Sequence, residues 1–390
     1  MKVLHVNHLL DPMFGGGTAE RTFQLSHELA KMGVECTILT LDIGRSHSRA
    51  VGIERLCIKT LPCIYSRFFV PKASLRQVIS VVENADIVQI FGNWTVLNFL
   101  VWRACLQLGK PYVFCPAGAL PVFGRSNLLK RIYSYWITRG ILRDAARCVC
   151  ITEDERSHFW DLDVDNSRID TIPNGIKPQN YYLETPFSSI TTFRASLGVG
   201  TAPFILFLGR LNPIKGPDLL LEAFASLANK WPAHHLVLGG PDGGMLWQLR
   251  EFAIANGLID RVHFTGFLEG EAKSAALHAA ELLVIPSRSE AMSIVVLEAG
   301  ATGTPVLFSD ACGLGLFERR GVGTMVLADA RSIELGLDGL LGQTAMLNAQ
   351  GAQLKRLVLS EFQWCDQARR HMSMYEQILK KADHLFSHEE

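Results

Sequence analysis

The stretch LLVIPSRSEAMSIVVLEAGATGTPVLFSD, residues 282–310, contains the pattern on which the fold prediction rests. A short apolar run at 282–287 leads through a loop to the apolar segment IVVLEAGA at 294–301, and a second short run follows at 304–310. Because Ser293 is a favourable N-cap residue, the middle segment is expected to be a short buried helix. The stretch therefore predicts a strand–helix–strand unit, the building block of a parallel sheet.

The same alternation extends over most of the 390 residues and falls into two series. The first series contains the strand-like runs KVLHVN, VECTILTL, ADIVQIFG and KPYVFCPAG, and the second contains FILFLGR (204–210), HHLVLGG (234–240), RVHFTGFL (261–268) and the stretch quoted above. A stretch rich in Pro, Asn, Gly and Thr at 172–203 lies between them and is interpreted as a linker. We therefore expect an α/β protein with two doubly wound domains that face each other across a cleft.

Composition excludes several classes of protein. The 38 basic and 38 acidic residues give a formal net charge of zero, so the chain as a whole shows no sign of binding nucleic acid. Nine cysteines scattered through apolar segments indicate reduced thiols and no disulfide framework. The sequence shows neither a signal peptide nor a run of about 18 apolar residues, so we expect a cytoplasmic protein without a transmembrane helix.

Two carboxylates in the quoted stretch, Glu290 and Glu298, are eight positions apart. On one helix they would lie about 12 Å apart along the axis and roughly 80° apart around it, too far to converge on one small group. Either they are unrelated, or Glu290 belongs to the preceding loop and only Glu298 to the helix. In the second case the amides at Ser293–Val295 could receive an anion, with Glu298 near ribose hydroxyls and Glu290 near another polyol. Surface glutamates in solvent are the alternative.

Two further loops follow strand-like runs. Arg210 and Lys215, in FLGRLNPIKGPDLLLEAF (207–224), could clamp a diphosphate, although loop cations are more often simply solvated. Gly15–Gly17 precede a helix-like segment at Thr18–Lys31 and could let backbone amides approach an anion, or could form a flexible turn. This loop does not match GxGxxG, which disfavours a nicotinamide-dependent dehydrogenase.

The motifs GRLNPIKG (209–216), IPNGI (172–176), FTGFL (264–268) and SEAMSIVVLEAGATGTPVL (289–307) resemble those of retaining glycosyltransferases with the GT-B fold, in particular glycosyltransferase family 4. Two glutamates eight residues apart are a weak pattern alone, but the combination is specific and covers essentially the whole chain. The resemblance implies a Rossmann-like first domain at 1–180 and a Rossmann-like donor domain at 181–364. A C-terminal helix at 365–390 would pack back on the first domain.

The resemblance also implies a role for each matching position. Arg210 and Lys215 would bind the diphosphate of a nucleotide-sugar donor, Glu298 the ribose, and Glu290 the transferred sugar; Glu290, Arg210 and Lys215 are thus the catalytic candidates. The remaining donor-binding candidates are Gly16, Gly17, Thr265, Gly266, Phe267, Leu268, Ser293, Ile294 and Val295. No cofactor or metal ion is expected, and the donor is a substrate.

One position departs from the family pattern. The segment YVFCPAGAL (112–120) has Ala117 where the family often carries His or Arg, and Arg125 or His8 are candidate substitutes. The sequence therefore predicts a retaining, metal-independent hexosyltransferase that uses a UDP- or GDP-sugar and a glycan or lipid-linked acceptor, with cell-surface polysaccharide or lipopolysaccharide synthesis as the setting. A catalytically impaired nucleotide- or glycan-binding subunit and a nucleotide-sugar epimerase are the alternatives.

The segment RSNLLKRIYSYWITRGILRDAAR, residues 125–147, has six basic residues and one acid. Leu128, Leu129, Ile132, Tyr133, Trp136 and Ile137 form an apolar stripe at helical spacing. Such a helix could lie on an anionic membrane surface, near a lipid-linked acceptor. The alternative is a helix whose apolar stripe faces the core and whose basic face is solvated.

Overall fold

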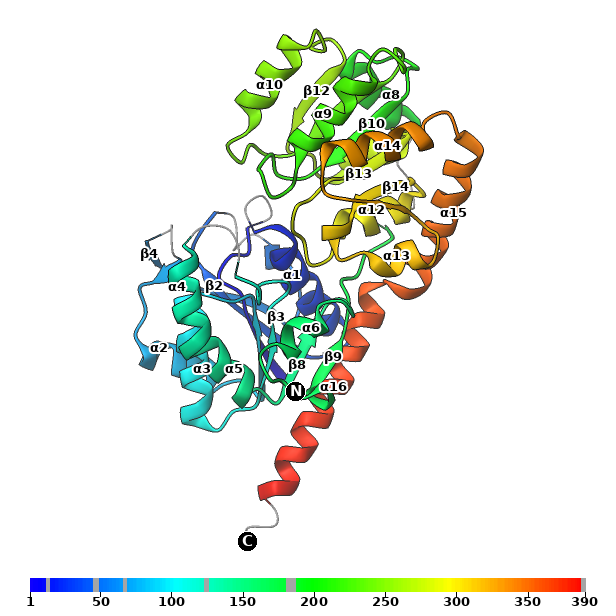
Figure 1. Ribbon diagram of the computed structural model, residues 1–390. Helices are drawn as coiled ribbons and strands as arrows, with labels where there is room; N and C mark the ends of the chain where they lie inside the picture. Colours follow the sequence, from blue (N-terminus) through cyan, green and yellow to red (C-terminus); the bar gives the residue numbers. More distant parts are fainter. Residues whose placement is uncertain (12–14, 45–48, 66–68, 123–125, 180–186, 387–390) are drawn as a thin grey trace. The chain divides into compact units, whose positions relative to one another are not determined.

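The computed structural model describes residues 1–11, 15–44, 49–65, 69–122, 126–179 and 187–386. The chain divides into two compact units (Figure 1). The first contains Met1–Asn174 and Trp364–Glu390, and the second contains Gly175–Gln363. The boundary suggested by the sequence, at 180/181, falls outside the described residues. Each unit is built on a parallel β-sheet, so the predicted α/β architecture is confirmed.

The first unit contains a seven-stranded sheet in the order β3-β2-β1-β6-β7-β8-β9. All its neighbouring strands are parallel. The strands are β1 (Lys2–Val6), β2 (Glu35–Leu41), β3 (Leu56–Leu61), β6 (Ile87–Phe91), β7 (Tyr112–Cys115), β8 (Arg147–Cys150) and β9 (Ile169–Thr171). A short antiparallel pair, β4 (Cys63–Tyr65) and β5 (Val70–Pro71), lies outside this sheet.

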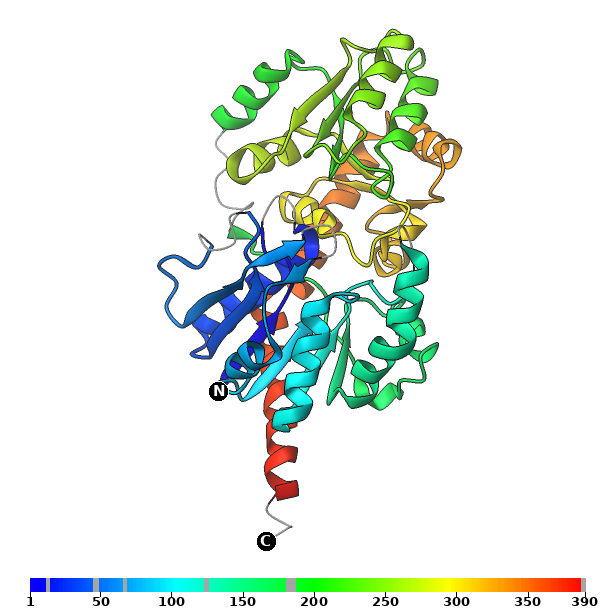
Figure 2. The same ribbon diagram turned by 90° about the vertical axis from the view of Figure 1, so that its left-hand side faces the viewer.

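Helices cover both faces of this sheet (Figures 1 and 2). On one face α1 packs against α16, and on the other α2 packs against α3. Crossovers between parallel strands are right-handed, so connections that run in opposite directions from β1 place their helices on opposite faces of the sheet. The helices are α1 (Gly16–Lys31), α2 (Leu75–Val82), α3 (Val96–Leu108), α4 (Asn127–Tyr133), the π-helical turn η3 (Ser134–Thr138), α5 (Arg139–Asp144), α6 (Arg156–Trp160), the 3-10 turn η4 (Asn166–Arg168) and α16 (Trp364–Phe386).

Buried polar side chains fix α16 and the end of the first unit to α1 and the sheet. His5 on β1 contacts Ser26 through Nδ1 at 2.6 Å and the Tyr375 hydroxyl through Nε2 at 3.2 Å. Arg21 on α1 donates to the Asn174 side chain at 3.0 Å and to the Ile172 carbonyl at 2.8 Å, which holds the IPNG turn. Burial lowers the pKa of His5 to about 3, so this imidazole is neutral at pH 7.

The second unit contains a six-stranded parallel sheet in the order β12-β11-β10-β13-β14-β15. Its strands are β10 (Phe204–Leu208), β11 (His235–Gly239), β12 (Val262–Gly266), β13 (Leu282–Ile285), β14 (Val306–Ser309) and β15 (Thr324–Val326). Its helices are α8 (Phe187–Leu197), α9 (Pro217–Leu227), α10 (Leu246–Ala255), α11 (Gly270–Ala279), α12 (Ile294–Thr302), the 3-10 turn η5 (Asp310–Cys312), α13 (Gly315–Arg319), α14 (Ala330–Leu340) and α15 (Thr344–Glu361).

Each sheet has one point at which the strand order reverses. In the first unit the chain moves from β1 to β2 on one side and later to β6 on the other, and in the second it moves from β10 to β11 and later to β13. Loops that leave the carboxyl ends of two such strands diverge, and the space between them is where open α/β sheets bind ligands. The loops after β10 and β13 are therefore the place to look for a site in the second unit.

None of the helices within the described ranges is both long and apolar enough to span a lipid bilayer.

Candidate functional site

The loops that follow β10 and β13 are held together by Arg288. Its backbone amide donates to the Ile214 carbonyl at 2.7 Å, and its guanidinium donates to the Pro213 carbonyl at 2.7 Å. The guanidinium also forms a two-pronged ion pair with Asp218 on α9, with its shorter contact at 2.6 Å. The residues between these contacts, including Lys215, are thereby fixed against the loop that carries Glu290.

Gly216 makes this close approach possible. It is the N-cap of α9 and has a φ of +68°, in the left-handed region. A Cβ at this position would lie 2.1 Å from the carbonyl oxygen of Pro286, at the end of β13. Only glycine can adopt this φ without strain and also leave room for the Pro286 carbonyl, so the packing of the two loops explains why glycine follows Lys215 in GRLNPIKG.

Lys215 and Glu290 form an ion pair between these loops. Lys215 Nζ lies 2.7 Å from Glu290 Oε1, and the two side chains are 30% and 14% exposed. The Ser287 hydroxyl donates to the other carboxylate oxygen at 3.0 Å, and the backbone amide of Glu290 donates to the Ala311 carbonyl at 2.8 Å. Two of the three catalytic candidates, Lys215 and Glu290, are thus held in place by the protein itself.

Glu290 precedes the helix and Glu298 lies on it. Helix α12 begins at Ile294 with Ser293 at the N-cap, although the Ser293 side chain makes no capping hydrogen bond. Ser293 is buried, while Ile294 and Val295 are half-buried in the first turn. The two glutamates therefore lie on either side of the helix start, which is the second of the two arrangements that the sequence left open.

Glu298 is paired with Lys273, a residue that the sequence did not single out. Glu298 Oε1 lies 2.7 Å from Lys273 Nζ on α11, and the Glu298 side chain is only 8% exposed. In the sequence Lys273 is one cation in the segment EGEAKSAALHAA, and no local pattern connects it to a glutamate 25 positions away. Only the packing of α11 against α12 reveals the pair.

The other donor-site candidates lie at the same edge of this sheet. Arg210 follows β10, and its side-chain stem packs close to Gly243 in the loop after β11. Thr265 and Gly266 end β12, and Phe267 and Leu268 begin the next loop. The Gly266 carbonyl accepts a hydrogen bond from the Gly240 amide at 2.7 Å, which places this segment beside the end of β11.

The glycine candidates belong to the first unit. Gly16 and Gly17 are the first residues of α1, with Gly15 at the N-cap, and Gly16 has a φ of +62°. The helix thus begins two residues earlier than Thr18, where the local pattern suggested. The Gly15 amide donates to the Asp11 carbonyl at 2.8 Å. These residues follow β1 at the point where the strand order of the first sheet reverses.

His8 lies at this same reversal point, on the loop after β1. Its ring centroid lies 4.6 Å from that of Phe69, with the ring planes tilted by 57°, and within the described part of the chain its Nδ1 has no hydrogen-bond partner. Burial lowers the pKa of His8 to about 4, so the imidazole is neutral at pH 7. Arg125, the other candidate substitute for the missing family side chain, lies outside the described residues.

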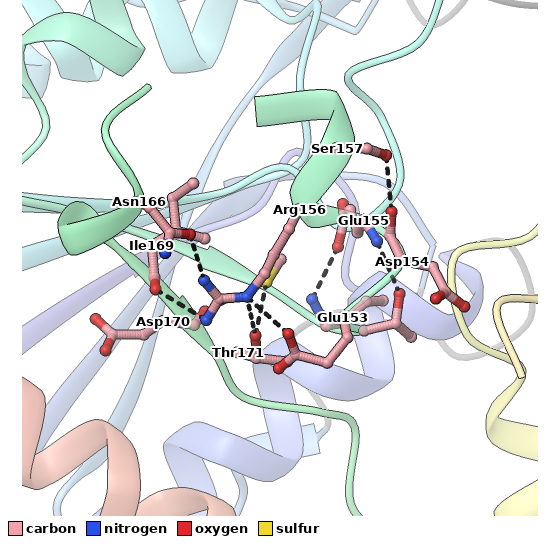
Figure 3. A network of polar contacts seen from close by, with 12 residues as sticks. Glu153, Asp154, Glu155, Arg156, Ser157, Asn166, Ile169, Asp170 and Thr171 are labelled. Carbon is pink, nitrogen blue, oxygen red and sulfur yellow. Dashed lines mark hydrogen bonds and ion pairs between the residues drawn. The ribbon is translucent and has the colours of Figure 1, made fainter. Parts of the chain in front are cut away.

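Ala117 lies in a turn after β7 that a buried carboxylate holds. Ala117 has a φ of +51°, and the amide of the next residue, Gly118, donates to Glu155 Oε1 at 2.6 Å. Glu155 also accepts from the Ile151 amide at 2.8 Å, and burial raises its pKa. Figure 3 shows Glu155 next to Arg156, whose guanidinium joins α6 to η4 and β9 through its contacts with Asn166, Ile169 and Thr171.

Over the described ranges, the side chains of His, Cys, Asp and Glu form no group of three or more that could hold a metal ion.

Two family models match the chain. The model described as glycosyl transferase 4-like domain covers residues 16–175, and the one described as glycosyl transferases group 1 covers residues 189–340. The two matches correspond to the two structural units.

Curated relatives match over almost the full length. A D-inositol 3-phosphate glycosyltransferase of Mycobacterium marinum is 31% identical over 395 aligned residues, which cover 90% of this chain and 79% of the relative. The enzyme of the same name from Gordonia bronchialis is 30% identical, with 97% and 88% covered. A third, from Frankia alni, is 28% identical, with 87% and 90% covered.

Solved structures share the fold. The structure of Anabaena Alr3699/HepE in complex with UDP and glucose superimposes with a TM-score of 0.82 at 18% identity and covers 97% of this chain and all of that one. WaaG, described as a glycosyltransferase involved in lipopolysaccharide biosynthesis, gives a TM-score of 0.69 at 19% identity, with 94% and 98% covered. Full-length relatives, both family models and the two Rossmann-like sheets agree: the chain belongs to the glycosyltransferases of the family 4 type with the GT-B fold.

Proposed function

We propose that the protein is a retaining hexosyltransferase whose donor, a UDP- or GDP-sugar, binds at the reversal point of the second sheet. The observation that carries this proposal is the ion pair between Lys215 and Glu290, which joins the two diverging loops at 2.7 Å. A cation and a carboxylate in contact there could serve two neighbouring parts of one ligand, the phosphates and the sugar. Helix α12 begins at Ile294, four positions after Glu290, and would add backbone amides.

In the proposed mechanism the protein stabilises charge on the leaving group. As the bond between the sugar and the nucleoside diphosphate breaks, negative charge grows on the phosphates, and Lys215 with Arg210 would balance it. The acceptor hydroxyl attacks from the same face, and its proton passes to the departing phosphate, so configuration is retained. Glu290 would bind sugar hydroxyls, and Glu298, held by Lys273, would bind the ribose. This scheme uses neither a divalent metal nor a cofactor.

Two acceptor classes compete in this proposal. We favour a hydroxyl on a glycan or lipid-linked sugar in cell-surface polysaccharide biosynthesis, and the fold neighbour WaaG is described as acting in lipopolysaccharide biosynthesis. The curated relatives carry the name of D-inositol 3-phosphate glycosyltransferases, which points to a small phosphorylated cyclitol. Incubation of the donor with each acceptor, followed by mass spectrometry of the products, decides between them.

The donor assignment is tested with UDP-, GDP-, ADP- and dTDP-sugars. A ligand at a hundredfold excess over its dissociation constant raises apparent stability by about 2.7 kcal/mol, which a thermal shift detects. We expect one UDP- or GDP-sugar to stabilise the protein and to be hydrolysed slowly. Lys215→Ala should reduce the shift, whereas Lys230→Ala, which alters an exposed ion pair elsewhere in the second unit, should keep it. If no nucleotide sugar shifts the wild type, the donor site is assigned wrongly.

A binding-only subunit is the second candidate, and Ala117 motivates it. The φ of +51° at Ala117 is one that histidine tolerates better than most residues, so Ala117→His fits the backbone. For an active enzyme we expect turnover in the wild type and an equal or higher rate in Ala117→His. Nucleotide binding without turnover in either protein would favour the binding-only subunit, and an isomerised donor formed without acceptor would favour an epimerase.

A further inference from the structure

The helical segment α4–η3–α5 exposes a row of large apolar side chains. Five of them, on α4 and the π-helical turn η3, project from the first unit and are at least half exposed: Leu128 72%, Leu129 58%, Ile132 50%, Tyr135 62% and Trp136 72%. Single exposed apolar residues are common on protein surfaces, but five within nine positions form a contiguous patch. The alternative in which the apolar stripe faces the core is therefore wrong for the four of these residues that belong to the stripe, Leu128, Leu129, Ile132 and Trp136.

The opposite side of the same segment attaches it to the first unit. The Tyr133 hydroxyl donates to the Thr95 carbonyl at 2.8 Å, and the Trp94 indole donates to Ser134 Oγ at 3.0 Å. At the next turn the Thr138 hydroxyl, which is buried, donates to the Asn93 side chain at 3.0 Å. Tyr133 and Ile137, which the helical pattern placed in the stripe, are less exposed than its other members and are replaced there by Tyr135.

Helix geometry accounts for these positions. An α-helix advances 100° per residue, so Tyr133 and Ile137 lie about 140° and 180° around the axis from Leu128, on the side that faces the first unit. Ile132, Tyr135 and Trp136 lie about 40°, 20° and 80° from Leu128, and the π-helical turn leaves Tyr135 and Trp136 exposed on that side. Their rings contact each other edge to face, with centroids 5.0 Å apart.

Cations border this row and no acid interrupts it. Arg131 and Arg139 are exposed, and neither forms an ion pair with any residue in the described part of the chain. The Arg139 guanidinium lies 5.9 Å from the centre of the Tyr135 ring. From residue 127 to residue 143 the sequence contains no Asp or Glu, and Asp144 is engaged by Arg143 and by the Trp102 indole. The row is thus apolar in the middle and cationic at its edges.

We propose that this surface, the five apolar residues with Arg131 and Arg139, docks on an anionic lipid bilayer. We refer to it as the docking face. Its segment from 128 to 139 extends about 16 Å, and it would lie parallel to the membrane with Leu, Ile, Tyr and Trp in the headgroup region and the arginines on lipid phosphates. A second copy of this chain fits less well, because two docking faces would bring like charges together. The proposal does not depend on the donor assignment.

Docking would serve the transfer reaction if the acceptor is linked to a lipid. The docking face belongs to the first unit, whereas all the donor-site candidates except Gly16 and Gly17 belong to the second. Membrane binding and donor binding can therefore fail independently in an experiment.

Co-sedimentation with vesicles tests the proposal. Purified full-length protein is mixed with vesicles of phosphatidylcholine alone or with phosphatidylglycerol added, and the bound fraction is measured at low and at physiological salt. We expect binding to the anionic vesicles only, and weaker binding in salt. Arg131→Gln and Arg139→Gln should each lower the affinity roughly fivefold, since one interfacial cation contributes about 1 kcal/mol. Trp136→Ala should lower it at least as much.

Matched controls come from the second unit. Trp247 is also 72% exposed, so Trp247→Ala removes the same side chain at the same exposure and should bind as the wild type does. Arg319→Gln is the corresponding control for charge, because Arg319 is exposed. All these positions are on the surface, so unfolding midpoints should not change, and slow donor hydrolysis without vesicles should be equal in all the variants.

Three results would overturn the proposal. The first is a wild type that binds neither kind of vesicle, and the second is an affinity that the docking-face variants leave unchanged. The third is a dimer in light scattering that Trp136→Ala dissociates, which would assign the docking face to a second copy of the chain. Loss of donor binding in the nucleotide-sugar panel, with vesicle binding intact, would affect only the proposed function.

Discussion

The pair between Lys273 and Glu298 gives the most direct test of how the second unit is built. In Lys273→Met the side chain keeps its length and its apolar stem but loses the ammonium group, so Glu298 loses the partner at 2.7 Å. Breaking a fully buried pair costs about 3–5 kcal/mol, whereas exposed pairs contribute about 0–1 kcal/mol. Glu298 is 8% and Lys273 24% exposed, so we expect an intermediate loss of about 2 kcal/mol.

Differential scanning calorimetry measures this loss. For a domain of about 150–250 residues, 1 kcal/mol shifts Tm by about 2–4 °C, so Lys273→Met should lower Tm by about 4–8 °C. The matched control is Lys230→Met, because Lys230 and Asp338 also approach to 2.6 Å but are 59% and 31% exposed. This control should lower stability by less than about 1 kcal/mol.

A double variant separates the ion pair from general packing. Lys273→Met with Glu298→Gln leaves no buried charge unpaired, so its loss should be smaller than the sum of the two single losses. If Glu298 also binds the ribose, Lys273→Met should reduce the thermal shift produced by a UDP-sugar. The reasoning is refuted if Lys273→Met is as stable as Lys230→Met, or if the two single losses simply add.

The remaining predictions concern the donor loops and the first unit. Lys215→Ala should lower kcat by roughly 10²–10³-fold, as expected when one group that stabilises a leaving oxyanion is removed, and steady-state kinetics with saturating donor checks this. Gly216→Ala should destabilise the protein by about 3 kcal/mol in urea unfolding, because its φ is +68° and the new methyl group would lie 2.1 Å from the Pro286 oxygen; a variant as stable as the wild type would contradict this packing. Burial lowers the pKa of His5 to about 3 and that of His8 to about 4, so below pH 6.5 the unfolded chain binds more protons than the folded one. Stability should therefore fall as the pH drops from about 6.5 toward 3, by up to about 1.4 kcal/mol per pH unit for each histidine, and His5→Asn should show a shallower slope in urea titrations at several pH values.

Local patterns in the sequence predicted the fold well. Short apolar runs bounded by Gly and Pro correspond to the strands β10 to β14, and Ser293 lies at the start of α12 as the N-cap pattern indicated. Such features depend on residues within a few positions of one another. The spacing of Glu290 and Glu298 was informative for the same reason, since helix geometry alone excluded a shared helical face.

Long-range partners could not be predicted in this way. No pattern around Lys273 indicates that it meets Glu298, and none around Gly216 shows that the Pro286 carbonyl lies against it. The helix boundary at Gly16 was also placed too late, because glycine has a low helix propensity and the local pattern therefore assigned all three glycines to the loop.

The segment 127–144 shows most clearly what a local sequence pattern cannot predict. Periodicity showed that an apolar stripe exists, but it could not show what, if anything, covers that stripe. Tertiary hydrogen bonds to Thr95 and Asn93 hold the side of the segment that carries Tyr133 and Thr138 against the first unit, so Tyr135 is exposed while Tyr133 and Ile137 are less exposed.

The sequence alone therefore determined the two α/β units, the order of their strands along the chain and the family, because these follow from periodicity and short motifs. The tertiary structure decided which charges are paired, which glycine is indispensable at a loop crossing, and which side of an amphipathic helix is exposed. Those properties depend on contacts between residues far apart in the chain, and the free energy of such contacts is set by burial and geometry that no local pattern contains.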